Sequence, residues 1–296
     1  MTDADRSAEP DGGVTVSAAE TASQDGTGRA LLASRVGAIA WREFRVVTRT
    51  RWTGGIAVLF GLFSLAIVGL AGSQVGTTRV GSLFVTLAEL SVYLVPMAAL
   101  AVGYDAVVGP AERGTLDALF ALPVPRSAVL VGTYLGRALA LASGLVVGLA
   151  AGGVLFAAKH GPGVVGPYLQ YTLATVGVAL AFLAVSVCLS TVVSEKARAL
   201  GGALLAWVWF VFVHDLFALG LVVAVQPPAA VSTLLVALNP ADLLRVAVLA
   251  MVPTGGGGVG ALIASTSLSL AVVAVALCAW IVAPVGLAAW LIGRRY

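Results

Sequence analysis

Residues 164–193 read VVGPYLQYTLATVGVALAFLAVSVCLSTVV and contain no Asp, Glu, Lys or Arg. A helix rises about 1.5 Å per residue, so about 20 apolar residues are enough to cross the hydrocarbon core of a bilayer. A membrane β-strand would instead alternate apolar and polar side chains over about 10 residues. This uninterrupted stretch therefore predicts a transmembrane helix and indicates an all-α membrane protein.

The composition extends this interpretation to the whole chain. Hydrophobic residues make up 59% of the 296 residues and charged residues 10%, whereas soluble domains average about 45–50% and about 25%. The net charge of +3 is small and dispersed, so we expect a lipid bilayer and no nucleic acid as partner. Six stretches are long enough to span: 54–72, 82–107, 128–157, 164–193, 199–225 and 262–292.

The segment before the six-helix domain (54–296) has two parts. Residues 1–30 are acidic and rich in small side chains, which predicts a disordered tail. Residues 31–53 carry an apolar side at helical spacing and arginines opposite, which predicts an amphipathic helix on the inner leaflet with Trp41 and Trp52 as anchors. The apolar side is Val36, Ile39, Ala40, Phe44 and Val47, and the arginines are Arg35, Arg42, Arg45 and Arg49.

The basic residues predict the orientation, because cytoplasmic loops carry the excess of Lys and Arg. With the N-terminus in the cytoplasm, only Arg79, Lys159 and Arg245 fall outside. We therefore expect a multi-pass protein of the cell membrane with both termini in the cytoplasm. The remaining basic residues near the spans then lie inside: Arg29, Arg35, Arg42, Arg45, Arg49, Arg51, Arg113, Arg126, Lys196, Arg198, Arg294 and Arg295.

The connection between the second and third spans has more structure than a plain linker requires. Gly109 and Pro110 should end the second span, and residues 112–122 can form a short helix with an apolar face. Pro123 and Pro125 should end that helix, and Ser127 can cap the third span. Such a helix on the membrane surface suits docking in a groove of a soluble partner. Its apolar face consists of Leu116, Leu119 and Phe120.

This connection, ERGTLDALFALPVPRSAVLVGTYLGR at residues 112–137, resembles the signature E-x-G-T-L-x-x-L-L-x-x-P-V-x-R of ABC-2-type transporter permeases. Phe120 and Thr133 depart from it, at positions where Leu and Lys are usual. The sequence WREF with Glu43, the Ser194-Glu195 pair and LNPADLLR at 238–245 extend the resemblance, the last toward the NosY-like branch associated with nitrous oxide reductase maturation. The matching residues are Glu112, Gly114, Thr115, Leu116, Leu119, Pro123, Val124 and Arg126.

The resemblance implies a coupling helix at residues 112–126, seated on a separate ATPase subunit that holds ATP and Mg²⁺. It also implies a second contact through the helix with Glu43, and a working transporter with two copies of each subunit. The docking residues on this view are Glu112, Arg113, Gly114, Thr115, Leu116, Leu119, Pro123, Arg126 and Glu43.

The residues independently indicate that any ATPase is a different polypeptide. A P-loop needs the pattern G-x-x-x-x-G-K-[ST] to hold phosphates. The chain has two lysines, Lys159 and Lys196, and neither follows that pattern. We therefore expect no cofactor in this chain and no enzymatic activity of its own.

Several ionisable residues fall within or beside the expected spans, where they are costly unless they face protein or water. They are compatible with a polar translocation path or gate, or with packing pairs such as Asp105 with Arg137. His214 beside Asp215 resembles an oriented imidazole, a type of zinc or copper ligand, but one histidine and two distant cysteines do not form a metal pathway by spacing, and we expect no metal. The residues concerned are Glu89, Asp105, Arg137, His214 and Asp215.

The connection before the sixth span contains a helix start, with Asn239 as cap, Pro240 in the first turn and Asp242 near the positive end of the dipole. We expect a short apolar helix here, at the outer interface or dipping into the membrane. The sequence leaves open the cargo and direction: copper-enzyme maturation, export of drugs, lipids or peptides, and, from another class, an intramembrane enzyme or ion-driven carrier.

Overall fold

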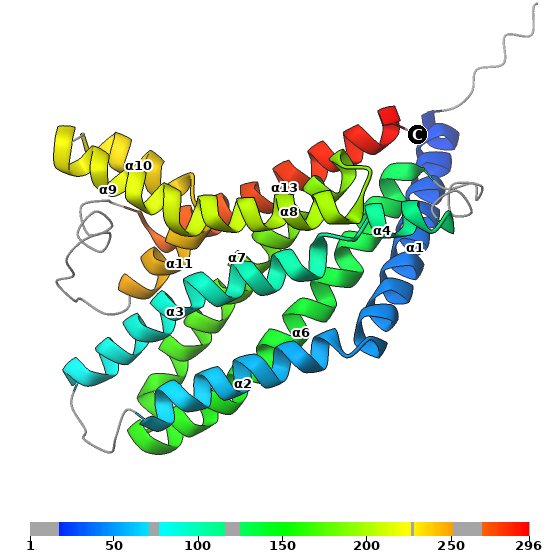
Figure 1. Cartoon of the computed structure of the whole chain (residues 1–296). Helices are drawn as coiled ribbons and strands as arrows, with labels where there is room; N and C mark the ends of the chain where they lie inside the picture. Colours follow the sequence, from blue (N-terminus) through cyan, green and yellow to red (C-terminus); the bar gives the residue numbers. More distant parts are fainter. Residues whose placement is uncertain (1–17, 71–76, 116–124, 226–227, 251–267, 296) are drawn as a thin grey trace, which may run out of the picture.

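The computed structural model describes residues 18–70, 77–115, 125–225, 228–250 and 268–295, and within them all regular structure is helical (Figure 1). In chain order the elements are α1 (Ala18–Arg49), α2 (Trp52–Leu70), α3 (Thr77–Gly103), α4 (Val108–Glu112), α6 (Arg126–His160), the 3₁₀ turn η1 (Pro162–Val164), α7 (Val165–Val192), α8 (Lys196–Val208), the π-helical η2 (Trp209–Val213), α9 (His214–Val225), α10 (Ala229–Ala237), α11 (Pro240–Leu249) and α13 (Leu270–Arg295).

Six segments of the described chain are long and apolar enough to cross a membrane, which confirms the predicted number of spans. The second is Val80–Glu112, so it includes most of α3, a turn and α4. The fifth, Lys196–Val225, joins α8, η2 and α9. Residues 262–267, the predicted beginning of the sixth span, lie outside the described residues.

Glycines of α6 allow two other helices to approach its backbone closely. A Cβ added at Gly136 would lie 2.4 Å from the carbonyl oxygen of Ala40 in α1, and one at Gly148 would lie 2.7 Å from that of Ala57 in α2. Small residues favour such helix contacts in lipid, where van der Waals packing has to replace the hydrophobic driving force. Similar close approaches occur at Gly132, Gly144 and Gly152.

Helix α1 differs from the predicted interfacial helix in its surroundings and in its length. Its apolar side packs on α6 instead of facing the inner leaflet, because the glycine surface there admits the buried Ala40 and the side chain of Ile39. It also begins at Ala18, inside the segment predicted to be disordered, where alanine-rich sequence favours helix. The rest of that segment, residues 1–17, lies outside the described residues.

The helices place different elements at the two ends of the bundle. Figure 1 shows α1, α4 and the end of α13 at one end, and α9, α10 and α11 at the other. We call these the inner and outer ends, following the predicted topology. At the outer end, the ammonium group of Lys159 in α6 donates hydrogen bonds to the carbonyls of Val68 and Gly69, at 3.2 and 3.0 Å, and so caps α2.

The inner connection departs from prediction at both of its ends. The break in the second span is a turn at residues 104–107, and Gly109 and Pro110 lie within α4. Pro110 is in the first turn of α4, where its missing N–H breaks no intrahelical bond. At the other end, α6 begins at Arg126 with Pro125 at the cap position, so Ser127 is not the cap.

The chain turns after α4 through Gly114, whose φ of 68° is in the left-handed region that favours glycine. The hydroxyl of Thr115 donates to the carbonyl of Pro110 at 3.1 Å and stabilises this turn. The rest of the predicted coupling helix, with Leu116, Leu119, Phe120 and Pro123, lies outside the described residues.

At the outer end, α10 and α11 form a hairpin with an angle of 115° between them. The predicted cap is confirmed, since the Asn239 side chain accepts a hydrogen bond from the backbone N–H of Ala241 at 3.0 Å. Residues 240–248 of α11 are all buried, so this helix enters the bundle and does not lie along its surface. Helix α10 is not predicted by the sequence, because its short apolar run lacks a helical period.

The glycine contacts yield a stability prediction. Gly136→Ala should lower the free energy of unfolding by about 1–3 kcal/mol, because the new methyl group would overlap a backbone carbonyl. Gly166→Ala is the matched control, since the space beside Gly166 in α7 is open. Thermal unfolding in detergent measures both, and equal stability of the two variants would contradict the close α1–α6 contact.

Candidate functional site

The inner end contains an ion cluster centred on Arg137 of α6. Its Nε lies 3.1 Å from Oε1 of Glu43 in α1, and its Nη1 lies 2.7 Å from Oδ1 of Asp105 in the turn before α4. The guanidinium also donates to the carbonyl of Val102. The predicted pairing of Asp105 with Arg137 is thus confirmed, and the cluster joins α1, α6 and the end of α3.

Lys196, the first residue of α8, links this inner cluster to the short segment between α7 and α8. Its Nζ lies 3.5 Å from Oδ2 of Asp105 and 5.5 Å from the ring centroid of Tyr104. Its backbone N–H donates to Oε1 of Glu112 at 2.6 Å. Because a carboxylate favours the exposed N–H groups at a helix start, Glu112 stabilises the N-terminus of α8 from another segment of the chain.

The turn at residues 104–107 is held by a hydroxyl group of α7. Oγ of Ser190 accepts hydrogen bonds from the backbone N–H groups of Val107 and Val108, both at 3.1 Å. These N–H groups begin α4 and would otherwise be buried without an acceptor. Ser190 therefore acts as the cap of α4 from another helix, which sequence reasoning about neighbouring residues does not find.

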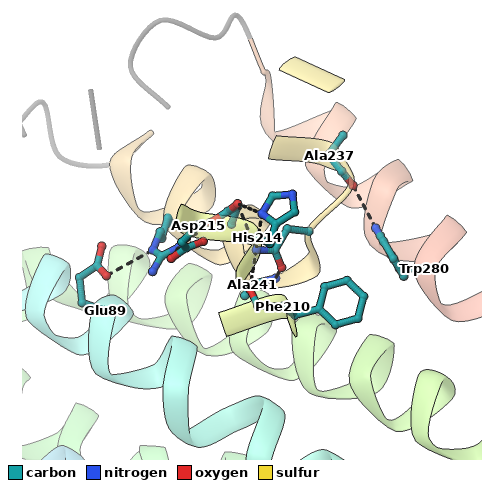
Figure 2. Close-up of polar contacts among 10 residues, drawn as sticks. Glu89, Phe210, His214, Asp215, Ala237, Ala241 and Trp280 are labelled. Atoms are coloured by element: carbon teal, nitrogen blue, oxygen red, sulfur yellow. Dashed lines mark hydrogen bonds and ion pairs between the residues drawn. The ribbon is translucent and has the colours of Figure 1, made fainter. Parts of the chain in front are cut away.

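The outer end contains a second ion cluster, centred on Arg245 of α11 (Figure 2). Its Nη1 lies 3.0 Å from Oδ2 of Asp215 in α9 and also contacts Asp242 one turn earlier in α11. Its Nε lies 3.2 Å from Oε2 of Glu89 in α3. Arg245 is 4% exposed, so three carboxylates from three helices compensate one buried guanidinium.

Asn239 joins this outer cluster to the π-helical segment η2. Its Nδ2 donates to the carbonyl of Phe210 at 2.9 Å and to Oδ2 of Asp242 at 3.2 Å, and it lies 3.2 Å from Nδ1 of His214. A π-helical turn disrupts the usual helical hydrogen bonds, and such turns often occur at functional sites. Here an amide from the outer hairpin satisfies the carbonyl of Phe210 (Figure 2).

On the side away from the outer cluster, Trp280 of α13 holds the outer hairpin in place. The indole Nε1 of Trp280 in α13 donates to the carbonyl of Ala237, the last residue of α10, at 2.9 Å. The rings of Trp280 and Phe210 meet edge to face with centroids 5.5 Å apart. The hairpin is therefore tied to α3, η2, α9 and α13 at once.

The outer cluster also contains a possible group of metal ligands. His214, Asp215 and Asp242 each offer an atom within 4.8 Å of the others. Arg245 already bonds one oxygen of each carboxylate, Oδ2 of Asp215 and Oδ1 of Asp242, so its guanidinium compensates the charge that a metal ion would otherwise compensate. The geometry favours an arginine-centred ion cluster and adds no support to a zinc or copper site.

The structure brings some of the singled-out ionisable residues together and separates others. Glu89, His214 and Asp215 meet at the outer end, whereas Asp105 and Arg137 meet at the inner end, so the five do not form one continuous path. Sequence reasoning missed Arg245 and Asp242 as their partners, although the three-residue spacing of Asp242 and Arg245 on a helix is a usable signal. Asn239 and Lys196 were also missed as members of the two clusters.

Comparison with known proteins identifies the family. The sequence model described as ABC-2 family transporter protein matches residues 37–295. The chain belongs to the ABC-2 transporter family. It is similar to the probable ABC transporter permease protein NosY of Pseudomonas aeruginosa, with 33% identity over 267 residues, 87% of this chain and 97% of the relative. The protein of the same name from Stutzerimonas stutzeri is 32% identical over 255 residues, 82% of this chain and 92% of the relative.

The chain is thus the permease subunit of an ABC transporter and a multi-pass membrane protein, as its resemblance implied. In this family the ATPase is a separate subunit, so the permease is not itself the enzyme.

The described part of the implied docking surface is divided by the fold. Residues 112–115 are exposed at the inner end. Residues 116–124 lie outside the described residues, and Arg126 then begins α6. The side chain of Glu43 is only 12% exposed and bonds Arg137, so its carboxylate holds α1 on α6.

The outer cluster yields a second prediction. Arg245→Met should lower the free energy of unfolding by about 3–5 kcal/mol, because it leaves carboxylates without their buried counter-ion. Arg198→Met is the control, since Arg198 pairs with Glu195 at an exposed site and its loss should change stability by less than about 1 kcal/mol. Thermal unfolding of purified protein measures the difference, and similar midpoints would contradict the central role of Arg245.

Proposed function

We propose that this permease couples ATP hydrolysis by a separate ATPase subunit to movement of cargo across the membrane, and that residues 112–126 with the α8 start form the docking surface. One observation carries the proposal. Glu112 bonds the first backbone N–H of α8, so the described parts of the two inner connections, residues 112–115 and the start of α8, lie together at the surface. ATP and Mg²⁺ belong to the partner subunit, because this chain has no P-loop.

The inner cluster supplies a route from this surface into the bundle. Lys196 beside Glu112 contacts Asp105, Asp105 contacts Arg137, and Arg137 contacts Glu43. These contacts link α8, the end of α3, α6 and α1 without a gap. A displacement of the docking surface would therefore act on three membrane spans and on α1 together, which is what transport coupled to nucleotide binding requires.

A second copy of the chain is the proposed partner inside the membrane. In the most apolar stretch of the fifth and of the sixth span, only 17% and 11% of the residues are buried within one chain, compared with 56% in the second and fourth spans. Lipid covers part of such faces, but a two-subunit transporter needs an interface, and these two spans are the ones with most surface left. Both termini are proposed to be cytoplasmic.

The cargo role that we favour is maturation of a copper enzyme, nitrous oxide reductase. It is supported by the likeness to proteins named NosY across most of both chains. The LNPADLLR motif of the outer hairpin, which resembles the NosY-like branch, adds to this support. The alternative is a general exporter of drugs, lipids or peptides with the same fold. A gene neighbourhood with copper-enzyme maturation genes separates the first role from the second, whereas an adjacent ATPase gene is expected for both.

Docking is tested by Glu112→Gln in the complex reconstituted with its ATPase. Loss of the charged acceptor at the α8 start should lower transport-coupled ATP hydrolysis roughly fivefold, the equivalent of about 1 kcal/mol for an exposed hydrogen bond to a charged group. Glu112→Asp retains a carboxylate and should recover part of the rate. Thr233→Ala at the outer end is the control for a general loss of activity.

Unchanged coupled hydrolysis in Glu112→Gln, with the ATPase still bound, would contradict the docking proposal. Co-purification of the ATPase and correct membrane insertion distinguish weaker docking from misfolding.

The orientation is tested by labelling single cysteines in a background without Cys188 and Cys278. Arg113→Cys and Ala197→Cys should react with a membrane-impermeant reagent only from the cytoplasmic side, and His160→Cys only from the outside. The opposite pattern would invert the topology and move the proposed docking surface away from the ATPase.

A further inference from the structure

Two adjoining cavities lie at the inner end, beside the inner cluster and the described part of the proposed docking surface. The first has a volume of about 310 Å³ and lies between α1, α4, α6 and the turn before α4. The second has about 430 Å³ and lies between α2 and α3. Both volumes are within the range of about 300–1,000 Å³ of small-molecule sites. The two cavities share Thr50, Trp52 and Ala101 in their linings, so they form one continuous surface.

The first cavity carries an excess of two positive charges. Its lining contains four basic side chains and two carboxylates, and the carboxylates are those of Glu43 and Asp105. Both carboxylates are already bonded by Arg137 and Lys196 in the inner cluster. The other two cations are Arg42 and Arg113, and no carboxylate of the described residues lies within ion-pair distance of either. The cavity is therefore complementary to an anion.

The second cavity is apolar and opens on the outside of the bundle. Its lining includes Leu59 and Met97, which are 46% and 54% exposed on the faces of α2 and α3. Gly55 provides room on α2, because no described residue outside its own helical turn has an atom within 4 Å of the position that a Cβ would take. Trp52, half exposed, lies where the charged and apolar cavities meet, and tryptophan is enriched at membrane–water interfaces.

We propose that these cavities bind one anionic phospholipid of the inner leaflet. Its phosphate group lies in the first cavity with Arg42 and Arg113, and an acyl chain lies in the second between Gly55 and Met97. Basic pockets between membrane helices on the cytoplasmic side attract anionic headgroups, and that leaflet carries the negative surface potential. A soluble anion would use only the charged cavity, whereas the apolar continuation toward the membrane matches a lipid tail.

The bound lipid would contact α1, α2, α3 and α4 at once. It would lie against the inner cluster, since Glu43, Asp105 and Arg137 form one wall of the first cavity. The proposal does not depend on the ATPase, because every contact comes from this chain.

Native mass spectrometry of the delipidated full chain tests the site by titration with phosphatidylglycerol, phosphatidylcholine and glycerol 3-phosphate. We expect one tightly held phosphatidylglycerol, weaker retention of phosphatidylcholine and no retention of glycerol 3-phosphate. Arg42→Gln combined with Arg113→Gln should weaken phosphatidylglycerol about 30-fold, since each basic residue near an anionic lipid surface contributes roughly a factor of five. Gly55→Leu should also weaken it, by filling the second cavity.

Two control variants match these changes. Arg49→Gln removes a cation from the same helix α1, and Gly54→Leu adds the same side chain at a neighbouring open position, but neither residue lines a cavity. Both should bind phosphatidylglycerol like the unaltered chain. Unchanged binding in the arginine pair or in Gly55→Leu would overturn the proposal. Retention of glycerol 3-phosphate as strongly as the lipid would also overturn it, in favour of a site for soluble anions.

Discussion

A guanidinium inside an apolar bundle has to be surrounded by carboxylates, and this requirement organises both ends of the permease. Arg137 at the inner end is compensated by Glu43 and Asp105 from two other segments. Arg245 at the outer end is compensated by three acids from α3, α9 and α11. Since an unpaired charge in this environment is unstable, helices that are distant in sequence are held at defined positions.

The two clusters differ in what surrounds them. The inner cluster lies beside exposed backbone and side chains of residues 112–115 and borders a charged cavity, so it is reachable from outside the bundle. The outer cluster is formed around the buried residues Asn239, Asp242 and Arg245, which the hairpin of α10 and α11 contributes, while Glu89 of α3 is partly exposed. The position of the inner cluster beside exposed connections suits interaction with a partner, whereas the outer cluster holds the hairpin in the bundle.

The sequence predicts most of the fold, because the length of an apolar stretch is a local property. All six spans follow from that property, and the cap at Asn239 follows from residue type and spacing. The site is predicted only in part. The pair of Asp105 and Arg137 can be predicted because both residues lie near the same end of their spans. The bond from Glu43 to Arg137 cannot, because it depends on how α1 packs on the glycines of α6. The distribution of Lys and Arg places Arg245 in an outer loop but carries no information on burial, so it does not predict that Arg245 is buried in α11.

The backbone contacts of α6 restrict which parts of the permease can move. Where Gly136 and Gly148 meet carbonyl groups of α1 and α2, no side chain separates the helices and no rotamer change can make room for sliding. These three helices must therefore travel as one rigid body. The fifth and sixth spans bury far less of their surface inside one chain, so most of their apolar area faces lipid or another subunit.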